Sequence, residues 1–146
     1  MNDTKLIGRI IGILYRQSTT YFQNEFKPFG LGHSQGKVLR FIDIHEKVLP
    51  KQIAEYYNLD KGSVTSLIKG LEKNKFVIRE SHPTDKRCFY LSLSAKSKKI
   101  IPELNLIFQN WSSLLMSNFS EEEEKQLMVS LQKMTDNTSS QDPRIT

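Results

Sequence analysis

Apolar residues recur at helical spacing in the first third of the chain. In residues 4–28 they lie three and four positions apart, at Leu6, Ile7, Ile10, Ile11, Leu14 and Tyr15. This spacing predicts a helix, and the helix should end before Pro28, because proline disfavours helical geometry at the residue that precedes it. A second apolar stripe predicts another helix over about residues 33–46.

A helix, a turn and a second helix are predicted between residues 50 and 74. Pro50 opens the first of them, where its missing N–H is harmless. Asp60 is a good N-cap for the second, because its carboxylate can accept a hydrogen bond from the backbone N–H of Gly62 or Ser63. The apolar residues of that helix form one stripe, at Val64, Leu67, Ile68 and Leu71. Asn74 is expected to take the left-handed conformation that ends it.

Two strands and two further helices follow. Residues 76–79 and 88–93 read as strands of a hairpin with its tip at 82–87. Ser94 can cap a long helix that reaches about residue 118, and Pro102 should bend it. Ser120 and Glu123 form a capping box for a last helix that runs through about residue 135. Residues 136–146 are polar and are expected to be disordered.

This order of elements predicts a mainly α fold with a small β-wing in one chain of 146 residues. Residues 33–99 would form a winged helix-turn-helix, and residues 4–28 and 100–135 would flank it. The winged unit is nearly a complete core by itself, so the apolar stripes of the flanking helices have little left to cover. An isologous homodimer would bury them and would place two copies of the 61–73 helix on one face.

The positive charge is concentrated in one part of the chain. Residues 61–99 hold ten Lys and Arg against three acids, a charge of +7, whereas the rest of the chain has eleven against thirteen, a charge of −2. Such a positive surface attracts phosphate backbones, although a Lys-rich face can also be a solvated surface without a partner. No stretch approaches the roughly 20 apolar residues of a membrane span. The only cysteine, Cys88, has no disulfide partner, so a reducing cytoplasm is the expected location.

The polar side of the 61–73 helix contains small hydrogen-bonding residues and lysines, at Lys61, Ser63, Thr65, Ser66 and Lys69. Small polar side chains let a helix approach base edges closely, and lysines meet phosphates. A solvent-facing side usually mixes both signs of charge, so this pattern favours DNA. The hairpin adds Arg79, Asp85, Lys86 and Arg87 as wing candidates. Arg87 can reach a minor groove, with Asp85 orienting its guanidinium; an ordinary charged turn is the alternative.

The chain resembles the MarR family of transcriptional regulators in the order of its elements, in length, and in two segments. These are LPKQIAEYYNLDKGSVTSLIKGLEKNKFVIRE and the wing sequence DKRCFYLSLSAK. The resemblance implies a homodimeric DNA-binding regulator, commonly a repressor, that reads a palindromic operator and in many members is released by a small aromatic or phenolic effector. It places residues 60–69 in the major groove and Arg87 in the minor groove. Lys75 and Ser97 stand where the family usually has glycine.

An effector pocket is the least specific prediction. Its candidates are Tyr15, Phe22, Phe26, Gly36 and Trp111, although aromatic residues in such helices are more often core or dimer interface. No metal site, cofactor or enzymatic activity is expected, because the histidines are dispersed and no phosphate loop or nucleophile elbow occurs. Cys88 is interpreted as a structural thiol, with oxidant sensing as the alternative. A winged-helix protein-interaction module and a sequence-neutral DNA binder are the competing functions.

Overall fold

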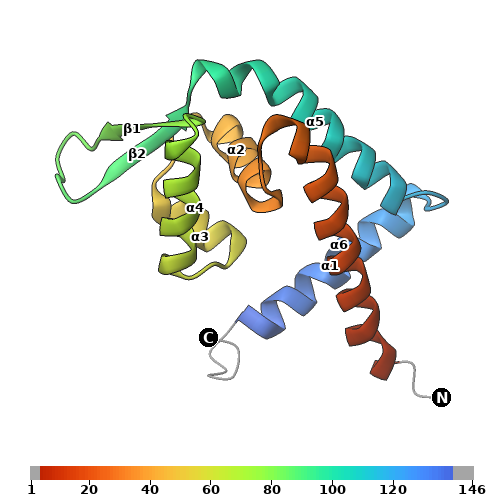
Figure 1. The fold of residues 1–146 in the computed structure, drawn as a ribbon. Helices are drawn as coiled ribbons and strands as arrows, with labels where there is room; N and C mark the ends of the chain where they lie inside the picture. Colours follow the sequence, from red (N-terminus) through yellow and green to blue (C-terminus); the bar gives the residue numbers. More distant parts are fainter. Residues whose placement is uncertain (1–3, 140–146) are drawn as a thin grey trace. The chain divides into compact units, whose positions relative to one another are not determined.

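The predicted order of helices and strands is confirmed by the structure, a computed structural model that describes residues 4–139 (Figure 1). The helices are α1 (Thr4–Phe26), the 3-10 helix η1 (Lys27–Phe29), α2 (His33–His45), α3 (Pro50–Tyr57), α4 (Lys61–Lys73), α5 (Ala95–Leu115) and α6 (Glu121–Ser139). The strands β1 (Val77–Ser81) and β2 (Phe89–Leu93) form an antiparallel hairpin. The chain divides into two compact units, residues 1–111 and 112–146.

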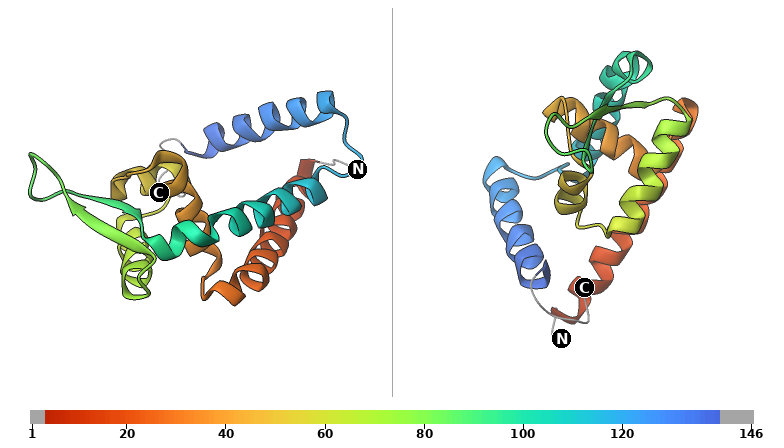
Figure 2. Two further views of the ribbon diagram at one scale, coloured as in Figure 1. Left: turned by 90° about the horizontal axis from the view of Figure 1, so that it is seen from above. Right: turned by 90° about the vertical axis from the view of Figure 1, so that its left-hand side faces the viewer.

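The core of the first unit forms where α2, α3 and α4 meet the base of the hairpin. Its most deeply buried side chains come from five helices, from β2 and from the residue before β1, at Phe26, Leu39, Ile42, Ile53, Leu71, Phe76, Leu91 and Leu104. The hairpin itself extends away from α3 and α4 (Figure 2). A buried base and a projecting tip are what a wing needs in order to reach beyond the helices.

The residues before α3 add a short third pairing to the wing. Val48 is fully buried, and its backbone N–H and carbonyl pair with those of Leu91 at N···O distances of 3.0 and 2.8 Å. The neighbouring Lys47 forms an ion pair with Glu80 of β1, at 2.7 Å between Nζ and Oε2. These contacts fix the base of the hairpin against the helices, which sets the direction in which the wing points.

The end of α4 differs from the prediction. Asn74 keeps φ at −91°, while Lys75 takes the left-handed conformation with φ at +59°. The Asn74 side chain instead donates a hydrogen bond from Nδ2 to the Gly70 carbonyl, at 3.0 Å. The Lys75 N–H bonds the Glu72 carbonyl at 3.0 Å, which turns the chain into the buried Phe76. The position that favours glycine is therefore Lys75.

Replacing Lys75 by glycine is expected to raise the free energy of unfolding. A left-handed conformation costs an L-residue about 1–2 kcal/mol, and glycine removes this cost. Glycine also makes the unfolded chain more flexible, which offsets part of the gain. Urea denaturation should therefore show a net stabilisation of roughly 0.5–1 kcal/mol. Lys73→Gly is the matched control. Because residue 73 is helical, this substitution should instead lower the free energy of unfolding by about 1 kcal/mol. Equal effects of the two substitutions would show that residue 75 carries no backbone strain.

Ser97 is the second residue that stands where a glycine is usual, and its hydrogen bonds explain how the chain tolerates it. It is fully buried in the first turns of α5, and its hydroxyl donates to the Phe76 carbonyl at 2.5 Å. The same hydroxyl lies 3.4 Å from the Ser94 hydroxyl, which also accepts a hydrogen bond from the Ser97 N–H at 3.3 Å. The polar group is thus satisfied inside the core, and it ties the start of α5 to the residue that precedes β1.

The last helices end at different residues from those predicted. α5 ends at Leu115 rather than near residue 118, where Asn118 has φ at +69°. α6 continues to Ser139, so residues 136–139 are helical and were wrongly assigned to a disordered tail. The remainder of that predicted tail, residues 140–146, lies outside the described part of the chain. The capping box that opens α6 is confirmed, since the Glu123 N–H bonds the Ser120 hydroxyl at 3.1 Å and the Ser120 N–H bonds Glu123 Oε1 at 3.3 Å.

Candidate nucleic-acid interface

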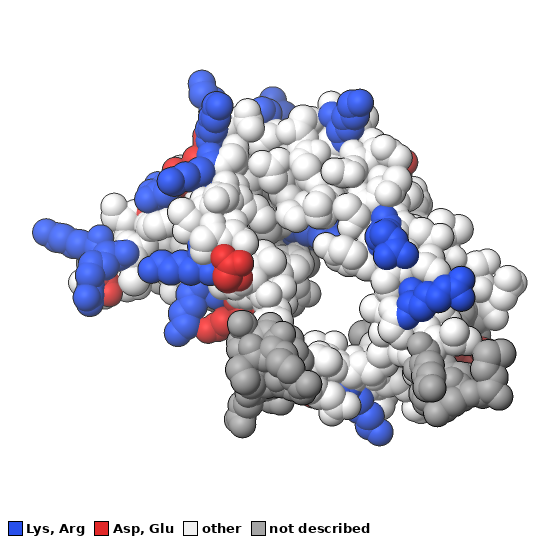
Figure 3. Space-filling view, turned by 60° about the horizontal axis from the view of Figure 1, so that its bottom comes forward, with Lys and Arg blue, Asp and Glu red and all other residues white. Residues whose placement is uncertain are grey.

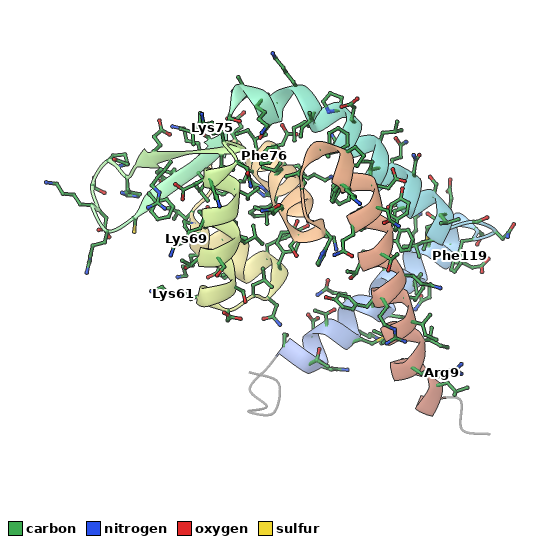
Figure 4. All side chains as sticks on the ribbon, viewed as in Figure 1. Arg9, Lys61, Lys69, Lys75, Phe76 and Phe119 are labelled. Carbon is green, nitrogen blue, oxygen red and sulfur yellow. The ribbon has the colours of Figure 1, made fainter. Side chains whose placement is uncertain are left out.

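Helix α4 presents two chemically different sides. Val64, Ile68 and Leu71 are buried against the core. All five residues predicted for DNA contact lie on the opposite, exposed side, at Lys61, Ser63, Thr65, Ser66 and Lys69. Figure 4 shows Lys61 and Lys69 extending from the same outer side of α4, with Lys75 and Phe76 at its other end. The core contacts thus fix the rotation of α4 and turn its polar side outward.

The hydroxyl groups on this side are not equivalent. Ser63 donates its hydroxyl hydrogen to Asp60 Oδ2 at 2.7 Å, and Thr65 donates its own to the Lys61 carbonyl at 2.8 Å. Both hydroxyls can therefore only accept hydrogen bonds from a ligand while those contacts persist. The Ser66 hydroxyl makes no hydrogen bond with any part of the chain that the structure describes, so it is available as both donor and acceptor.

Asp60 fixes the start of α4, as the sequence predicts. Its Oδ1 accepts a hydrogen bond from the Ser63 N–H at 2.8 Å. This backbone hydrogen bond, followed by the one from the Ser63 hydroxyl, holds the pKa of the Asp60 carboxyl below its usual range. A lowered carboxyl pKa means that the cap stabilises α4 at neutral pH and that this stabilisation is lost as the pH falls through the folded-state pKa.

Arg79 is directed toward α4 rather than toward the tip of the wing. Its Nη2 lies 2.6 Å from Glu72 Oε1, and its guanidinium lies 3.7 Å from the centre of the Phe89 ring. The side chain is still 48% exposed. The sequence pattern grouped Arg79 with the wing residues, but the structure gives it a partner on α4, and this ion pair holds the hairpin against that helix.

Asp85 organises the tip of the wing. Its Oδ1 accepts from the Arg87 N–H at 3.0 Å and lies 3.4 Å from Arg87 Nε, while Oδ2 accepts from the Cys88 thiol at 3.5 Å. The hydrogen bond from the Arg87 backbone is the main reason that the pKa of Asp85 lies below its usual range. Lys86 and Arg87 are both exposed. The predicted pairing of Asp85 with Arg87 is therefore present.

The same contact bears on Cys88. Burial, and then the hydrogen bond to Asp85, raise the pKa of the Cys88 thiol. A raised pKa keeps the thiol protonated at neutral pH, and the thiolate is the reactive form. The geometry thus favours the structural interpretation of this cysteine.

The charge of the surface follows the predicted distribution. Lys and Arg side chains gather at the left of Figure 3, on the end of the winged unit that carries α4 and the hairpin, where Asp and Glu side chains also lie among them. Within residues 4–139 no group of three His, Cys, Asp or Glu is placed to hold a metal ion. Among the helices of the same residues, none has both the length and the apolar character that crossing a membrane requires.

The residues predicted for an effector pocket do not share one environment. Phe22 and Phe26 are buried in the core, and a Cβ at Gly36 would lie 2.3 Å from Phe26 Cε2, so the Phe26 ring fills the space beside this glycine. Tyr15 is 66% exposed, and Trp111 stacks on Tyr21 with ring centres 4.9 Å apart. A hollow of about 370 Å³ lies elsewhere in the first unit, lined by Arg40, Phe41, Ile44, His45, Tyr56, Tyr57 and Phe108.

Comparison with known proteins identifies the family of the chain. A family model described as MarR family matches residues 29–87. The chain is 34% identical over 111 residues to the HTH-type transcriptional regulator SarZ of Staphylococcus epidermidis, a match that covers 76% of this chain and 74% of that protein. The chain belongs to the MarR family.

Solved structures of MarR family regulators have the same fold. A MarR transcriptional regulator from Methanosarcina mazei Go1 is 27% identical, with a TM-score of 0.80 over 91% of this chain and 96% of that one. A MarR family transcriptional regulator from Listeria monocytogenes, solved in complex with a 26-mer DNA, is 24% identical, with a TM-score of 0.85 over 90% of this chain and 87% of that one.

The comparisons confirm the resemblance and the winged-helix fold predicted from the sequence. The protein is a DNA-binding transcriptional regulator of the MarR family. MarR family regulators are transcription factors rather than enzymes, in agreement with the absence of catalytic motifs in the sequence. The interaction-module alternative gives way to DNA binding.

Proposed function

We propose that the protein is a homodimeric repressor that acts in the cytoplasm and binds a palindromic operator in a sequence-specific manner. The observation that carries this proposal is the exposed Ser, Thr and Lys side of α4 beside a wing whose tip presents Arg87. A dimer would place two α4 helices in half-sites about one DNA turn (~34–36 Å) apart. Occupying a promoter in this way would exclude the transcription machinery, which makes repression the expected direction of regulation.

The proposed role of each polar residue of the interface depends on its charge and on the hydrogen-bond donors and acceptors that it does not use within the chain. Ser66, with an uncommitted hydroxyl, is the candidate for base contact, while Ser63 and Thr65 would accept from base amino groups or support α4. Lys61 and Lys69 would meet phosphates. Arg87 would enter the minor groove with Lys86 beside it. Arg79 would act by holding the hairpin through Glu72, with any phosphate contact made from its exposed half.

Residues 4–28 and 100–135 are the proposed dimerisation helices, with residues 33–99 as the DNA-binding unit. Support comes from apolar side chains that are exposed on each of the two compact units. On α1 these are Ile7, Ile10, Ile11 and Leu14; in the second unit they are Leu114, Phe119, Met128, Val129 and Leu131. Helix α6 has apolar residues at helical spacing but no buried residue along Glu121–Ser139. Such surfaces are typical of a protein that needs a second copy to cover them.

The DNA contacts are tested by comparing two alanine substitutions. Arg87→Ala should weaken binding to a duplex selected by the wild-type protein by about 1–3 kcal/mol, because it removes a groove contact. Lys69→Ala should weaken binding to all duplexes alike and reduce the salt dependence by about one unit of slope. Fluorescence anisotropy at several salt concentrations separates the two effects. Lys125→Ala, on α6, is the control for simple loss of charge, and effects for Arg87 and Lys69 no larger than the control would contradict these roles.

The hollow in the first unit is the proposed effector site, in place of the five residues indicated by the sequence. The Arg40 guanidinium lies 4.6 Å from the centre of the Phe108 ring, and the Phe41 and Tyr56 rings lie with their centres 4.6 Å apart and their planes tilted by 34°. Burial raises the pKa of Tyr57 to about 12, and its hydroxyl donates to the Lys37 carbonyl at 2.9 Å. A cation beside flat aromatic walls suits a small aromatic carboxylate or phenol.

Release from DNA by hydroxybenzoates tests this site. Arg40→Gln should abolish release while leaving DNA binding in the absence of effector unchanged, because Arg40 lies outside the proposed DNA interface. Lys51→Gln, an exposed charge on α3 outside the hollow, is the matched control and should respond like the wild type. An Arg40→Gln protein that is released as readily as the control would rule out Arg40 as the anion-binding group.

A further inference from the structure

His82 occupies a central place in the wing tip that no DNA-contact role explains. Its Nδ1 accepts a hydrogen bond from the Asp85 N–H at 3.0 Å and another from the Thr84 N–H at 3.3 Å, and the Thr84 hydroxyl lies 3.4 Å away. The imidazole stacks on Tyr90 of β2, with ring centres 5.2 Å apart and an angle of 21° between the planes. The ring thus links the strand to the turn.

The direction of these hydrogen bonds fixes the protonation state that the tip requires. A backbone N–H can only donate, so Nδ1 must carry a free lone pair and the proton of the neutral ring must lie on Nε2. A second proton would occupy Nδ1, and both hydrogen bonds would then be lost. The geometry at His82 is therefore compatible only with the neutral ring.

The contacts continue from His82 to the residue proposed to enter the minor groove. His82 holds the backbone of Asp85, and the Asp85 carboxylate holds the backbone N–H of Arg87 at 3.0 Å and its Nε at 3.4 Å. Tyr90, His82, Asp85 and Arg87 thus form a continuous series of contacts from the sheet to the tip. Losing the His82 acceptor would free Asp85 and, with it, the orientation of Arg87.

We propose that His82 is a positioning residue of the wing, which holds Asp85 and thereby Arg87 in the arrangement that binds DNA, and that protonation of its ring weakens DNA binding. This inference rests on the proposed minor-groove role of Arg87. Histidine is the side chain whose charge ordinarily changes between pH 5 and 8. The regulator would then bind its operator less tightly as the surroundings become acidic.

Other charged groups around His82 oppose or support this effect. The Asp85 carboxylate attracts a charged imidazole, while Lys86 and Arg87 of the same tip repel it. On β1, Glu80 is engaged by Lys47 at 2.7 Å, and β2 contributes the Tyr90 ring rather than a charge. DNA phosphates would favour a charged His82, so acidification has two opposite effects, of which the loss of the two hydrogen bonds is proposed to be the larger.

Three substitutions of His82 separate the acceptor from the ring. Asparagine places Oδ1 where histidine has Nδ1, so it keeps the acceptor but cannot be protonated. Phenylalanine keeps the ring over Tyr90 without the acceptor, and alanine removes both. Fluorescence anisotropy near pH 7.5, with a duplex selected by the wild-type protein, measures the affinity of each variant. His82→Ala and His82→Phe should bind roughly three- to tenfold more weakly than wild type, which corresponds to the net contribution of one hydrogen bond or slightly more. His82→Asn should bind within about twofold of wild type.

The pH profile and a double-mutant cycle test the mechanism. As the pH falls from 8 to 5.5, the wild type should lose affinity for the duplex relative to His82→Asn. Both proteins contain His33 and His45, so the comparison cancels the contributions of these two residues. In an Arg87→Ala background, His82→Ala should cause little further loss, because the two residues act as one unit. Circular dichroism of each variant confirms that the fold is kept.

Each alternative result has a distinct meaning. Weak DNA binding by His82→Asn would overturn the positioning role. Wild-type binding that becomes stronger on acidification, relative to His82→Asn, would also overturn it and would indicate a direct contact between His82 and phosphate. Additive losses for His82 and Arg87 would overturn the link between them. If the Arg87→Ala variant binds DNA as well as wild type, the proposed function itself is contradicted. If Arg87→Ala binds DNA more weakly but the His82 variants bind normally, only this inference is contradicted.

Discussion

Replacing Phe26 by alanine is expected to lower the free energy of unfolding by about 3–5 kcal/mol, the usual cost of removing a fully buried aromatic ring. Phe26 has no exposed surface and lies at the end of α1. Its ring centre is 5.3 Å from that of Phe22 and 5.7 Å from that of Phe108 on α5. The substitution would leave a cavity where α1, α2 and α5 meet, and urea denaturation measures the loss.

The same site contains a test that is specific to its packing. A Cβ at Gly36 would lie 2.3 Å from Phe26 Cε2, so Gly36→Ala alone should cost about 1–3 kcal/mol through overpacking. In the Phe26→Ala background the space is empty, and Gly36→Ala should become neutral or stabilising by up to about 1 kcal/mol, the helix preference of alanine over glycine. Gly8→Ala, with nothing within 4 Å of its Cβ, is the control without a clash. Additive costs of the two substitutions would show that Phe26 does not fill the space beside Gly36.

Placing glutamate at Ile10 is expected to convert the protein to a monomer and to weaken DNA binding by at least about a hundredfold, because one half-site must then supply the affinity that two supplied together. Ile10 is 50% exposed, and Ile7, Ile11 and Leu14 on the same side of α1 are 42–45% exposed. A carboxylate buried without a partner in an apolar interface costs several kcal/mol. Size-exclusion chromatography with light scattering reports the mass, and anisotropy reports the affinity.

Gln23→Glu is the matched control for this substitution. It adds the same charge to the same helix, but helical spacing places residue 23 on the side of α1 away from Ile10, where it is exposed. The control should remain dimeric and should bind DNA nearly as well as wild type. A dimer that survives Ile10→Glu would remove α1 from the proposed interface.

Features that depend on nearby residues were predictable from the sequence. The Asp60 cap of α4 and the capping box of Ser120 and Glu123 involve residues three positions apart, and both are present. The apolar stripe of α4 predicted which side is buried, and therefore which hydroxyls and lysines are exposed. Asp85 and Arg87 are two positions apart, so their pairing could also be anticipated.

Features that depend on distant residues were not predictable. Arg79 is paired with Glu72 across the junction of α4 and β1, and no spacing rule relates the two. The sequence grouped Phe26 and Gly36 as candidates for one pocket but could not tell that the Phe26 ring fills the space beside the glycine. The hollow near Arg40 combines residues of α2, α3 and α5. Lys75 was missed because the neighbouring Asn74 has the higher preference for a left-handed conformation.

A dimer of this chain is proposed to read a specific operator. A selection of bound sequences from a random duplex pool, with the purified protein at near-physiological salt, tests it most directly. We expect enrichment of a palindrome whose half-sites lie about one helical turn apart. Binding that depends steeply on salt but enriches no sequence would contradict it and would indicate a sequence-neutral DNA binder.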